Sequence, residues 1–406
     1  MRIKAFQALK PPVKLALKVA SLPYDVVDTA EARKLVEGNP YSFFHVSRAE
    51  IALPDGTDLH ADAVYNKAAE VFREFQRKGV LLKDAEAAFY LYRLIREGRA
   101  QTGLIAVCHV GDYEENIIKK HEKTRKTPED DRTRHIAATN SHSGPVFLLY
   151  RDSAEVDALA AAVVKTAPLY DLTAPDGVQH TIWRIANTAP WVSAFGKIPQ
   201  AYIADGHHRA AAAARVARER KAANPKHNGH EEYNWFQAVL FPATQLRILP
   251  YNRCVKDLNG LSDEQFLEAV RSKFTICEKV TSQPKQPANI SMYFRNRWVG
   301  LSWVPDPVKN PVTALDVSVL QDRLLGPVLG IDDPRSNPRI EFVGGIRGTG
   351  ELEKHVQSGR AAVAFSMYPT TVDQLMAISD VGEVMPPKST WFEPKLRDGL
   401  IIHLLD

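Results

Sequence analysis

Hydrophobic positions recur along the chain with two different periods, and each period predicts one kind of element. Between residues 61 and 78, apolar side chains return every three or four residues, for example at Val64, Val71 and Phe75. This spacing places them on one side of a helix. Further helices are predicted over residues 30–37, 156–166 and 210–221. Short apolar runs bounded by Gly, Pro or polar residues predict strands over residues 41–46, 87–94, 102–110, 144–150, 180–185 and 201–204.

From Trp235 onward the pattern changes to shorter strands and hairpins, with helices predicted over residues 263–274, 317–329 and 372–379. This change predicts a mixed α/β (α+β) protein with two parts. We expect a ligand-binding region over residues 1–252 and a hairpin-rich C-terminal α+β domain over residues 253–406. The tail segment 385–396 is expected to return to the site of the first region.

Composition narrows the class of protein. The 406 residues are 45% hydrophobic and 25% charged, as in an ordinary soluble globular protein. The net charge of +4 provides no basic surface of the size that nucleic-acid binding requires, so nucleic acid is not expected as a partner. No apolar run reaches the roughly 18 residues that would span a membrane. Three widely separated cysteines, with no CxxC pair, fit a reducing cytoplasm.

The strongest candidate site begins where the apolar strand 201–204 runs into the sequence Asp-Gly-His-His-Arg. Gly206 allows the chain to turn sharply and to approach a ligand closely. The helix that follows presents unpaired N–H groups and the positive end of its dipole at this turn. Such a helix start binds anions, phosphate above all.

The side chains of this turn add to the same chemistry. Arg209 supplies a planar guanidinium that suits phosphate, and His207 and His208 can donate to phosphate oxygens or move protons. Asp205, at the end of the strand, can hold Mg²⁺ or orient a hydroxyl group. The alternative interpretation is that Asp205 only caps the helix and that the two histidines are adjacent by coincidence.

A second candidate is the charged segment Lys120–Arg125 within residues 117–139, which predicts a pair of solvated helices. On a helix, His121 and Arg125 share one face and Glu122 projects beside it. These residue types suit a polyphosphate, and Glu122 could serve as a general base or a Mg²⁺ ligand. A plain solvated helix face remains the alternative.

A third candidate is the Pro-rich segment 386–395 near the C-terminus. Two prolines stiffen it, and lysines, among them Lys388, flank hydroxyl-bearing and aromatic residues. Loops of this composition often carry ligand contacts, although a structural crossing is the alternative. The chain contains no GxxxxGK[ST], GxGxxG or GxSxG motif, so P-loop, Rossmann and α/β-hydrolase sites lose their main support.

The order of these motifs resembles a bacterial and archaeal family known as domain of unknown function 1015. The resemblance is carried by Pro23–Val27, Asn39–Phe43, His121–Arg125, Gly144–Phe147, Ile203–Arg209 and Pro386–Thr390. The Asp-Gly-His-His-Arg turn is also similar to the motif of the free serine kinases, which look like members of the ParB/sulfiredoxin-like fold. By position, the matching residues are Asp205, Gly206, His208 and Arg209.

The resemblance to these kinases implies a ParB/sulfiredoxin-like nucleotide-binding core. It implies transfer of a phosphoryl group from ATP or ADP to a small hydroxylated metabolite, with free L-serine as the first choice. The expected nucleotide-binding residues are Gly206, His207, Arg209, His121, Arg125 and Lys388. Mg²⁺ would bridge the phosphates, with Asp205 as its protein ligand. The expected catalytic residues are Asp205, His208 and Glu122.

Several alternatives remain at this stage. The base of the kinases matches no single residue here, so Asp25 and Glu50 stand beside the favoured Glu122. A ParB-like nucleotide switch or hydrolase without an acceptor is the main competing function. A nucleic-acid-binding adaptor disagrees with the charge, and sulfiredoxin-like chemistry lacks a cysteine near Asp205. The expected partner is a small-molecule substrate such as an amino acid, and a homodimer is left open.

Overall fold

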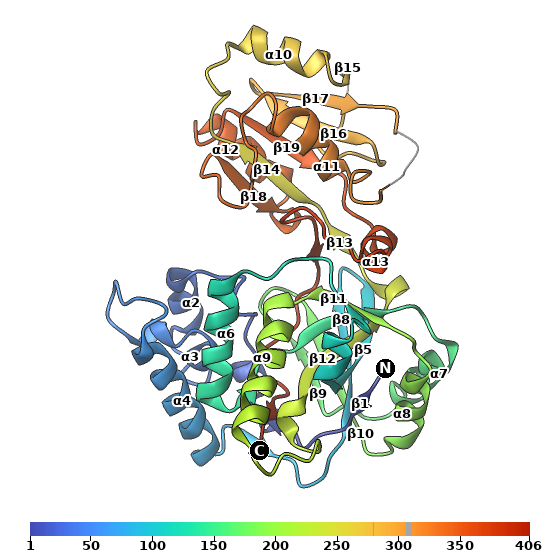
Figure 1. Ribbon diagram of the computed structural model, residues 1–406. Coiled ribbons are helices and arrows are strands. Elements are labelled where there is room, and N and C mark those ends of the chain that lie inside the picture. The colour runs from blue at the N-terminus through green and yellow to red at the C-terminus, as the bar shows by residue number, and fades with distance from the viewer. Residues whose placement is uncertain (279, 306–309) are drawn as a thin grey trace. The chain divides into compact units, whose positions relative to one another are not determined.

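A computed structural model describes residues 1–278, 280–305 and 310–406. The chain forms two compact units (Figure 1). The first comprises Met1–Leu246 together with Pro394–Asp406, and the second comprises Arg247–Glu393. The sequence placed one boundary at residue 252, whereas the chain crosses between the units at residue 246 and again at residue 393. The expected mixed α/β fold class is confirmed.

A nine-stranded sheet forms the centre of the first unit, in the order β6-β11-β8-β12-β5-β4-β10-β9, with β1 paired to β5. Its strands are β1 (Ile3–Lys4), β4 (Phe89–Arg96), β5 (Arg99–His109), β6 (Ile118–Lys119), β8 (Val146–Tyr150), β9 (Tyr170–Thr173), β10 (Gln179–Ile185), β11 (Ala201–Asp205) and β12 (Trp235–Pro242). The β6–β11 and β8–β12 pairs are parallel and the other pairs are antiparallel. Two-stranded pairs join β2 (Leu9–Lys10) to β3 (Leu82–Lys83), and β7 (Ser141–His142) to β21 (His403–Leu404).

Helices surround this sheet. They are α1 (Val13–Val19), α2 (Thr29–Val36), α3 (Phe44–Ser47), α4 (Asp62–Arg77), α5 (Val110–Glu114), α6 (Lys126–Thr139), α7 (Ala154–Val163), α8 (Ala189–Gly196) and α9 (His207–Ala223). Asp28 caps α2 with a capping box. Among the described residues, the helices are too short or too polar to cross a lipid bilayer.

The alanine-rich start of α9 explains how this helix is held. Residues 210–214 are all buried alanines. Ala210, Ala213 and Ala214 belong to the core cluster that contains Leu148 and Phe236, whereas Ala212 packs with Ile136 of α6. Small side chains let a helix backbone approach its neighbours closely, and α9 accordingly lies beside α6 (Figure 1). Its first turn is therefore fixed in position at the end of β11.

The second unit is built on a six-stranded antiparallel sheet in the order β15-β17-β16-β19-β14-β18. Its strands are β14 (Tyr251–Val255), β15 (Thr275–Cys277), β16 (Asn289–Phe294), β17 (Arg297–Ser302), β18 (Ile340–Gly344) and β19 (Val363–Met367), beside a separate pair of β13 (Ile248–Leu249) and β20 (Trp391–Phe392). Its helices are α10 (Asp263–Arg271), α11 (Asp316–Leu320), α12 (Thr349–Gln357) and α13 (Val372–Asp380).

Three sequence predictions of local structure were wrong. Residues 41–46 do not form a strand, because the chain turns into α3 and buries Phe43 against Phe72 of α4. A short apolar run does not distinguish a strand from a buried helical turn. Residues 117–139 are not a helical pair, because β6 pairs with β11 before α6 begins at Lys126. The helix expected over 317–329 is divided into α11 and a π-helical turn, Gln321–Leu325.

Candidate functional site

Gly206 forms the turn between β11 and α9. Its backbone lies in the left-handed region, with φ 94° and ψ 31°. A Cβ atom at this position would lie 2.9 Å from Arg209 Nε, so both the backbone conformation and the packing require glycine. The turn carries the N-terminus of α9, a helix of 17 residues, to the end of a buried strand. This is the strand–turn–helix arrangement that the sequence predicted.

Asp205 is held between two cations. Lys395 Nζ lies 2.8 Å from Asp205 Oδ2, and Arg209 Nη2 lies 3.7 Å from Asp205 Oδ1. Burial acts to raise the pKa of this carboxyl group, but Lys395 and Arg209 outweigh it and hold the pKa well below its usual range. Asp205 therefore stays ionised at neutral pH. It is a poor proton acceptor, but it holds the side chains of Lys395 and Arg209 by ion pairing.

Arg209 connects the turn to the strand beside it. Its guanidinium donates a hydrogen bond to the carbonyl oxygen of Pro145, just before β8, and the residue is buried. Burial acts to lower the pKa of Arg209, but the carboxylates of Asp205 and Asp25 outweigh it and raise the pKa. The first turn of α9 thus holds a permanent, largely desolvated positive charge, where electrostatic interactions are strong.

His207 and His121 pack against each other behind the turn. Their ring centroids are 4.4 Å apart with planes at 89°. The backbone N–H of His121 donates a hydrogen bond to His207 Nε2 at 3.4 Å. Burial lowers the pKa of His121 to about 4 and holds the pKa of His207 well below its usual value. Both rings are therefore neutral at pH 7. They fix the loop after β6 against α9 and add no positive charge to the site.

The loop between β6 and α6 also contacts the next histidine. The Arg125 backbone N–H donates to His208 Nε2 at 3.0 Å, so the ring proton of His208 lies on Nδ1. His121 and Arg125 do not share a helix face, because residues 120–125 form a loop. The sequence nevertheless identified two residues of this loop, His121 and Arg125, that contact the histidines of the turn. Glu122 lies at its edge, 3.8 Å from His207 Nδ1, with its side chain 47% exposed.

The other two candidate bases occupy different surroundings. Glu50 is buried and bound to Arg48 at 2.8 Å and to Thr29 Oγ1 at 3.3 Å, so a structural ion pair occupies it. Asp25 is exposed, yet it lies near enough to raise the pKa of Arg209. Asp25 therefore interacts electrostatically with Arg209 of the Asp205 turn.

The C-terminal motif reaches the turn through a lysine other than the expected one. Lys395 belongs to the first unit and binds Asp205. Lys388 belongs to the second unit, where its Nζ lies 5.4 Å from the centre of the Tyr251 ring. A role for Lys388 in nucleotide binding therefore stays a prediction.

The expected magnesium ligand, Asp205, is already paired with two cations. Among the described residues, no group of three or more His, Cys, Asp or Glu side chains could hold a metal ion. Asp205 is a single carboxylate, and it already pairs with Lys395 and Arg209. In nucleotide sites Mg²⁺ is usually held by one or two carboxylates together with substrate phosphates. Asp205 as a Mg²⁺ ligand therefore stays a prediction.

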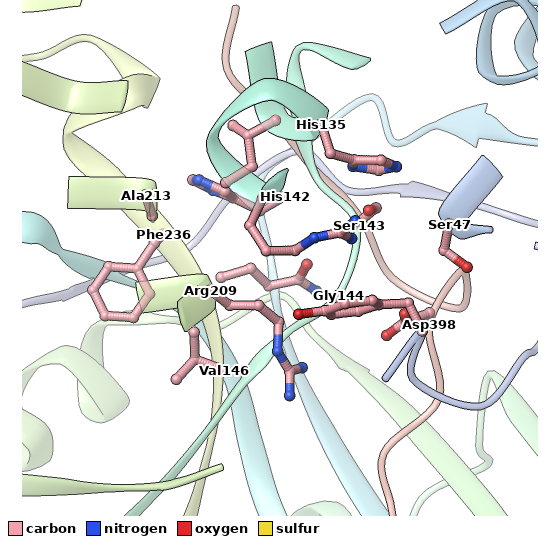
Figure 2. Close-up of a pocket in the computed structure, with 14 residues that line it drawn as sticks. Ser47, His135, His142, Ser143, Gly144, Val146, Arg209, Ala213, Phe236 and Asp398 are labelled. Carbon is pink, nitrogen blue, oxygen red and sulfur yellow. The ribbon is translucent and has the colours of Figure 1, made fainter. Parts of the chain in front are cut away.

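A cavity opens on the other side of Arg209. Arg209, His142, Gln237, Ser47 and Asp398 all contribute to its lining. Figure 2 shows Ala213 and Phe236 on one side of the cavity, Ser47 and Asp398 on the other, and Arg209 between them. Apart from Arg209, none of these lining residues was among the expected catalytic or nucleotide-binding residues. One signal was present, because Asp398 is a charged residue two positions before the apolar run 400–402.

Comparisons with solved structures find distant similarities. The chain is similar to SbnI with a C-terminal truncation from Staphylococcus aureus, with TM-score 0.40 and 11% identity over 74% of this chain and 87% of that chain. It is similar to a conserved hypothetical protein from Pyrococcus furiosus, with TM-score 0.36 and 13% identity over 74% and 95%. It is also similar to a free serine kinase in complex with AMP, with TM-score 0.35 and 12% identity over 73% and 92%. Comparison with curated proteins finds no match.

The sequence itself gives a clearer relationship. A family model described as a protein of unknown function, DUF1015, matches residues 3–318. The match includes the Asp205 turn, the loop that contacts it and most of the cavity lining. The chain therefore belongs to the DUF1015 family.

Proposed function

We propose that this protein is a phosphotransferase that moves a phosphoryl group from ATP or ADP to a small hydroxyl-bearing metabolite. The observation that carries the proposal is the Gly206 turn, which sets the N-terminus of α9 and the charged Arg209 guanidinium at the end of one buried strand. Helix N–H groups and a desolvated guanidinium together bind phosphate.

The charge balance of the site supports phosphoryl transfer. Such reactions depend mainly on positioning and on stabilising the charge of the transferred group. Lys395 pairs with Asp205 and limits its repulsion of an incoming phosphate. Arg209 supplies fixed positive charge. His207 and His121 position these groups from behind.

Free L-serine is the first acceptor to test, because the motif Asp205–Arg209 is similar to that of the free serine kinases. The geometry of the turn supports phosphate binding and leaves the acceptor to be identified. A nucleotide hydrolase or switch would use the same phosphate contacts without an acceptor. The two functions differ in one product, the phosphomonoester.

Phosphorus NMR separates these functions. Purified protein is mixed with Mg²⁺, ATP or ADP, and amino acids and small alcohols that include L-serine. A phosphotransferase gives a new phosphomonoester signal that requires one acceptor. Inorganic phosphate as the sole new product would instead assign a hydrolase or switch. If no nucleotide is consumed and none binds, the Asp205 turn serves another anion or the fold alone.

A further inference from the structure

Five buried polar atoms converge on the cavity beside Arg209 without a hydrogen-bond partner among the residues that the structure describes. They are Ser47 Oγ, His142 Nε2, Arg209 Nε, Gln237 Oε1 and Asp398 Oδ1. Buried polar groups in folded proteins are nearly always paired, since an unpaired group loses its water without replacement. Five such atoms on residues around one cavity therefore indicate that a polar ligand completes their hydrogen bonds.

Three of these atoms belong to residues that other contacts hold in place. The Gln237 amide donates from Nε2 to the Ile401 carbonyl oxygen at 2.7 Å, which leaves Oε1 on the lining. His142 Nδ1 faces His403 Nδ1 at 3.2 Å, which leaves Nε2 on the lining. Asp398 is fixed by two backbone hydrogen bonds to Ser21, at 2.9 and 3.2 Å. The site is thus built before any ligand arrives.

The donors and acceptors define the class of ligand. Arg209 Nε can only donate, whereas Gln237 Oε1 and an ionised Asp398 can only accept. Ser47 Oγ can do both. A phosphate or carboxylate group alone would satisfy Arg209 but would face the oxygens of Gln237 and Asp398 with further acceptors. Hydroxyl groups donate and accept, so they match the whole set. The cavity, about 30 Å³ in volume, has room for one such hydroxyl group, so it fits the hydroxyl end of a small molecule without net charge, such as a polyol or a hydroxy amino acid zwitterion.

We propose that this cavity binds the acceptor and that the Asp398 carboxylate takes the proton from its reacting hydroxyl group. This inference rests on the phosphotransferase proposed above. Arg209 connects the two places, because it lines the cavity while a Cβ on Gly206 would meet its Nε at 2.9 Å. One guanidinium therefore lies between the α9 turn and the acceptor.

The surroundings of Asp398 support this role. Its side chain is buried, with the residue 3% exposed, and burial raises its pKa to about 7. A base with a pKa near the working pH is suited to proton transfer. Asp205 is not, because its cations lower its pKa. Glu122 is largely exposed, and Glu50 is bound to Arg48.

The proposed step is balanced. The acceptor oxygen forms a bond to the terminal phosphorus of the nucleotide while its proton passes to Asp398 Oδ1. The bond from that phosphorus to the bridging oxygen breaks, and its electron pair leaves with the shortened nucleotide. The products are a phosphomonoester and a nucleotide with one phosphate fewer. Asp398 returns its proton to solvent when the product leaves.

Gly144→Ala tests the cavity without nucleotide. Its new methyl carbon would lie 3.0 Å from Asp398 Oδ1, inside the site. Gly196→Ala is the matched control, because a Cβ there meets nothing within 4 Å. Saturation-transfer NMR with L-serine and with glycerol measures binding to the full chain. We expect at least one probe to bind wild type and Gly196→Ala, with binding weakened at least tenfold in Gly144→Ala. Equal binding to all three proteins, binding of neither probe, or a crystal structure with only ordered water would overturn the cavity assignment.

Asp398→Asn tests the proton transfer. We expect phosphomonoester formation to slow by about 100-fold or more, as for removal of a general base, with nucleotide affinity close to that of wild type and no loss of thermal stability. A rate within threefold of wild type would overturn the role of Asp398 while leaving the phosphotransferase proposal intact. If wild type forms no phosphomonoester, the proposed function and this step fail together. Acceptor binding that Gly144→Ala weakens would still establish the cavity as a binding site.

Discussion

Lys395 Nζ lies 2.8 Å from Asp205 Oδ2, so a residue near the end of the chain is paired with the residue that opens the candidate turn. The two are 190 positions apart in the sequence. The Lys395 side chain is 13% exposed and that of Asp205 is 27% exposed, so water screens this ion pair only partly. The pair binds the segment 394–406 to the rest of the first unit. It also neutralises a carboxylate beside the proposed phosphate site.

Lys395→Met should lower the free energy of unfolding, because the Asp205 carboxylate loses one of the two cations that balance its charge. We expect a loss of about 2 kcal/mol at pH 7, below the range for fully buried pairs because both groups are partly exposed. The pKa of Asp205 is lowered in the folded protein, so the pair stabilises the protein above the unfolded-state pKa of about 4 and loses this effect as the pH falls further. Urea unfolding at pH 7 and pH 3 measures the change.

Lys197→Met is the control for that variant. Lys197 also lies 2.8 Å from a carboxylate, that of Glu155, but both side chains are largely exposed. We expect a change below about 1 kcal/mol, as for surface ion pairs. A Lys395 variant as stable as the Lys197 variant at pH 7 would contradict the structural role of the Lys395–Asp205 pair.

Gly206→Ala should destabilise the first unit and remove activity. Alanine at φ 94° is strained, and its methyl group would meet Arg209 Nε at 2.9 Å. Gly38→Ala separates the two effects, because Gly38 has φ 70° with nothing within 4 Å of a Cβ. We expect roughly 1 kcal/mol of destabilisation for Gly38→Ala and about 2–3 kcal/mol for Gly206→Ala, measured by urea unfolding. Equal losses of unfolding free energy in the two variants would mean that the Arg209 side chain moves away from the new methyl group without destabilising the protein.

Asp398 should give both stability and rate a pH dependence. Its pKa is raised to about 7 by burial, with Asp25 acting in the same direction and Arg209, Arg132 and Arg397 opposing. The folded protein therefore holds a proton that the unfolded chain releases near pH 4, so this group makes stability fall as the pH rises from 4 to 7. Asp398→Asn should abolish that part of the slope in unfolding measured across this range.

The same group predicts that the wild-type rate rises with pH and levels off above about 7, where Asp398 is ionised. A pH–rate profile of phosphomonoester formation measures this. A profile that is flat between pH 5 and 8 would contradict the assignment of Asp398 as the base.

Glu122→Gln should have a small effect. The Glu122 side chain is 47% exposed and 3.8 Å from His207 Nδ1, so it touches the site only at its edge. We expect less than a fivefold change in the rate of phosphomonoester formation, measured beside Asp398→Asn under the same conditions. A loss for Glu122→Gln that matches or exceeds the loss for Asp398→Asn would return the role of base to Glu122.

The sequence predicted the elements whose signals are local. The amphipathic helix 61–78, the strand 201–204 and the glycine turn after it follow from periodicity and backbone chemistry, and the structure contains them. The sequence also named His121 and Arg125 together with His207 and His208, which the fold brings into contact. It gave the loop 120–125 the wrong local structure, since charge density alone does not separate a loop from a helix.

The cavity could not be predicted because its residues meet only in three dimensions. Ser47, His142, Gln237 and Asp398 lie in four distant segments, and each looks ordinary in its local sequence. The pairing of Asp205 with Lys395 depends on the return of the C-terminal segment to the first unit. Periodicity carries no information about such long-range contacts, and the unpaired hydrogen-bonding atoms become apparent only once neighbouring segments are in place.

The most direct test of the proposed function compares acceptor-dependent phosphomonoester formation in Arg209→Gln and Arg215→Gln by phosphorus NMR. Both arginines lie on α9, but Arg209 is buried at its first turn, whereas Arg215 pairs on the surface with Asp130 and Glu219. We expect a rate about 100- to 1,000-fold lower in Arg209→Gln and a nearly unchanged rate in Arg215→Gln. Equal rates in the two variants, or no phosphomonoester from wild type with any acceptor, would contradict a phosphotransferase site at the Asp205 turn.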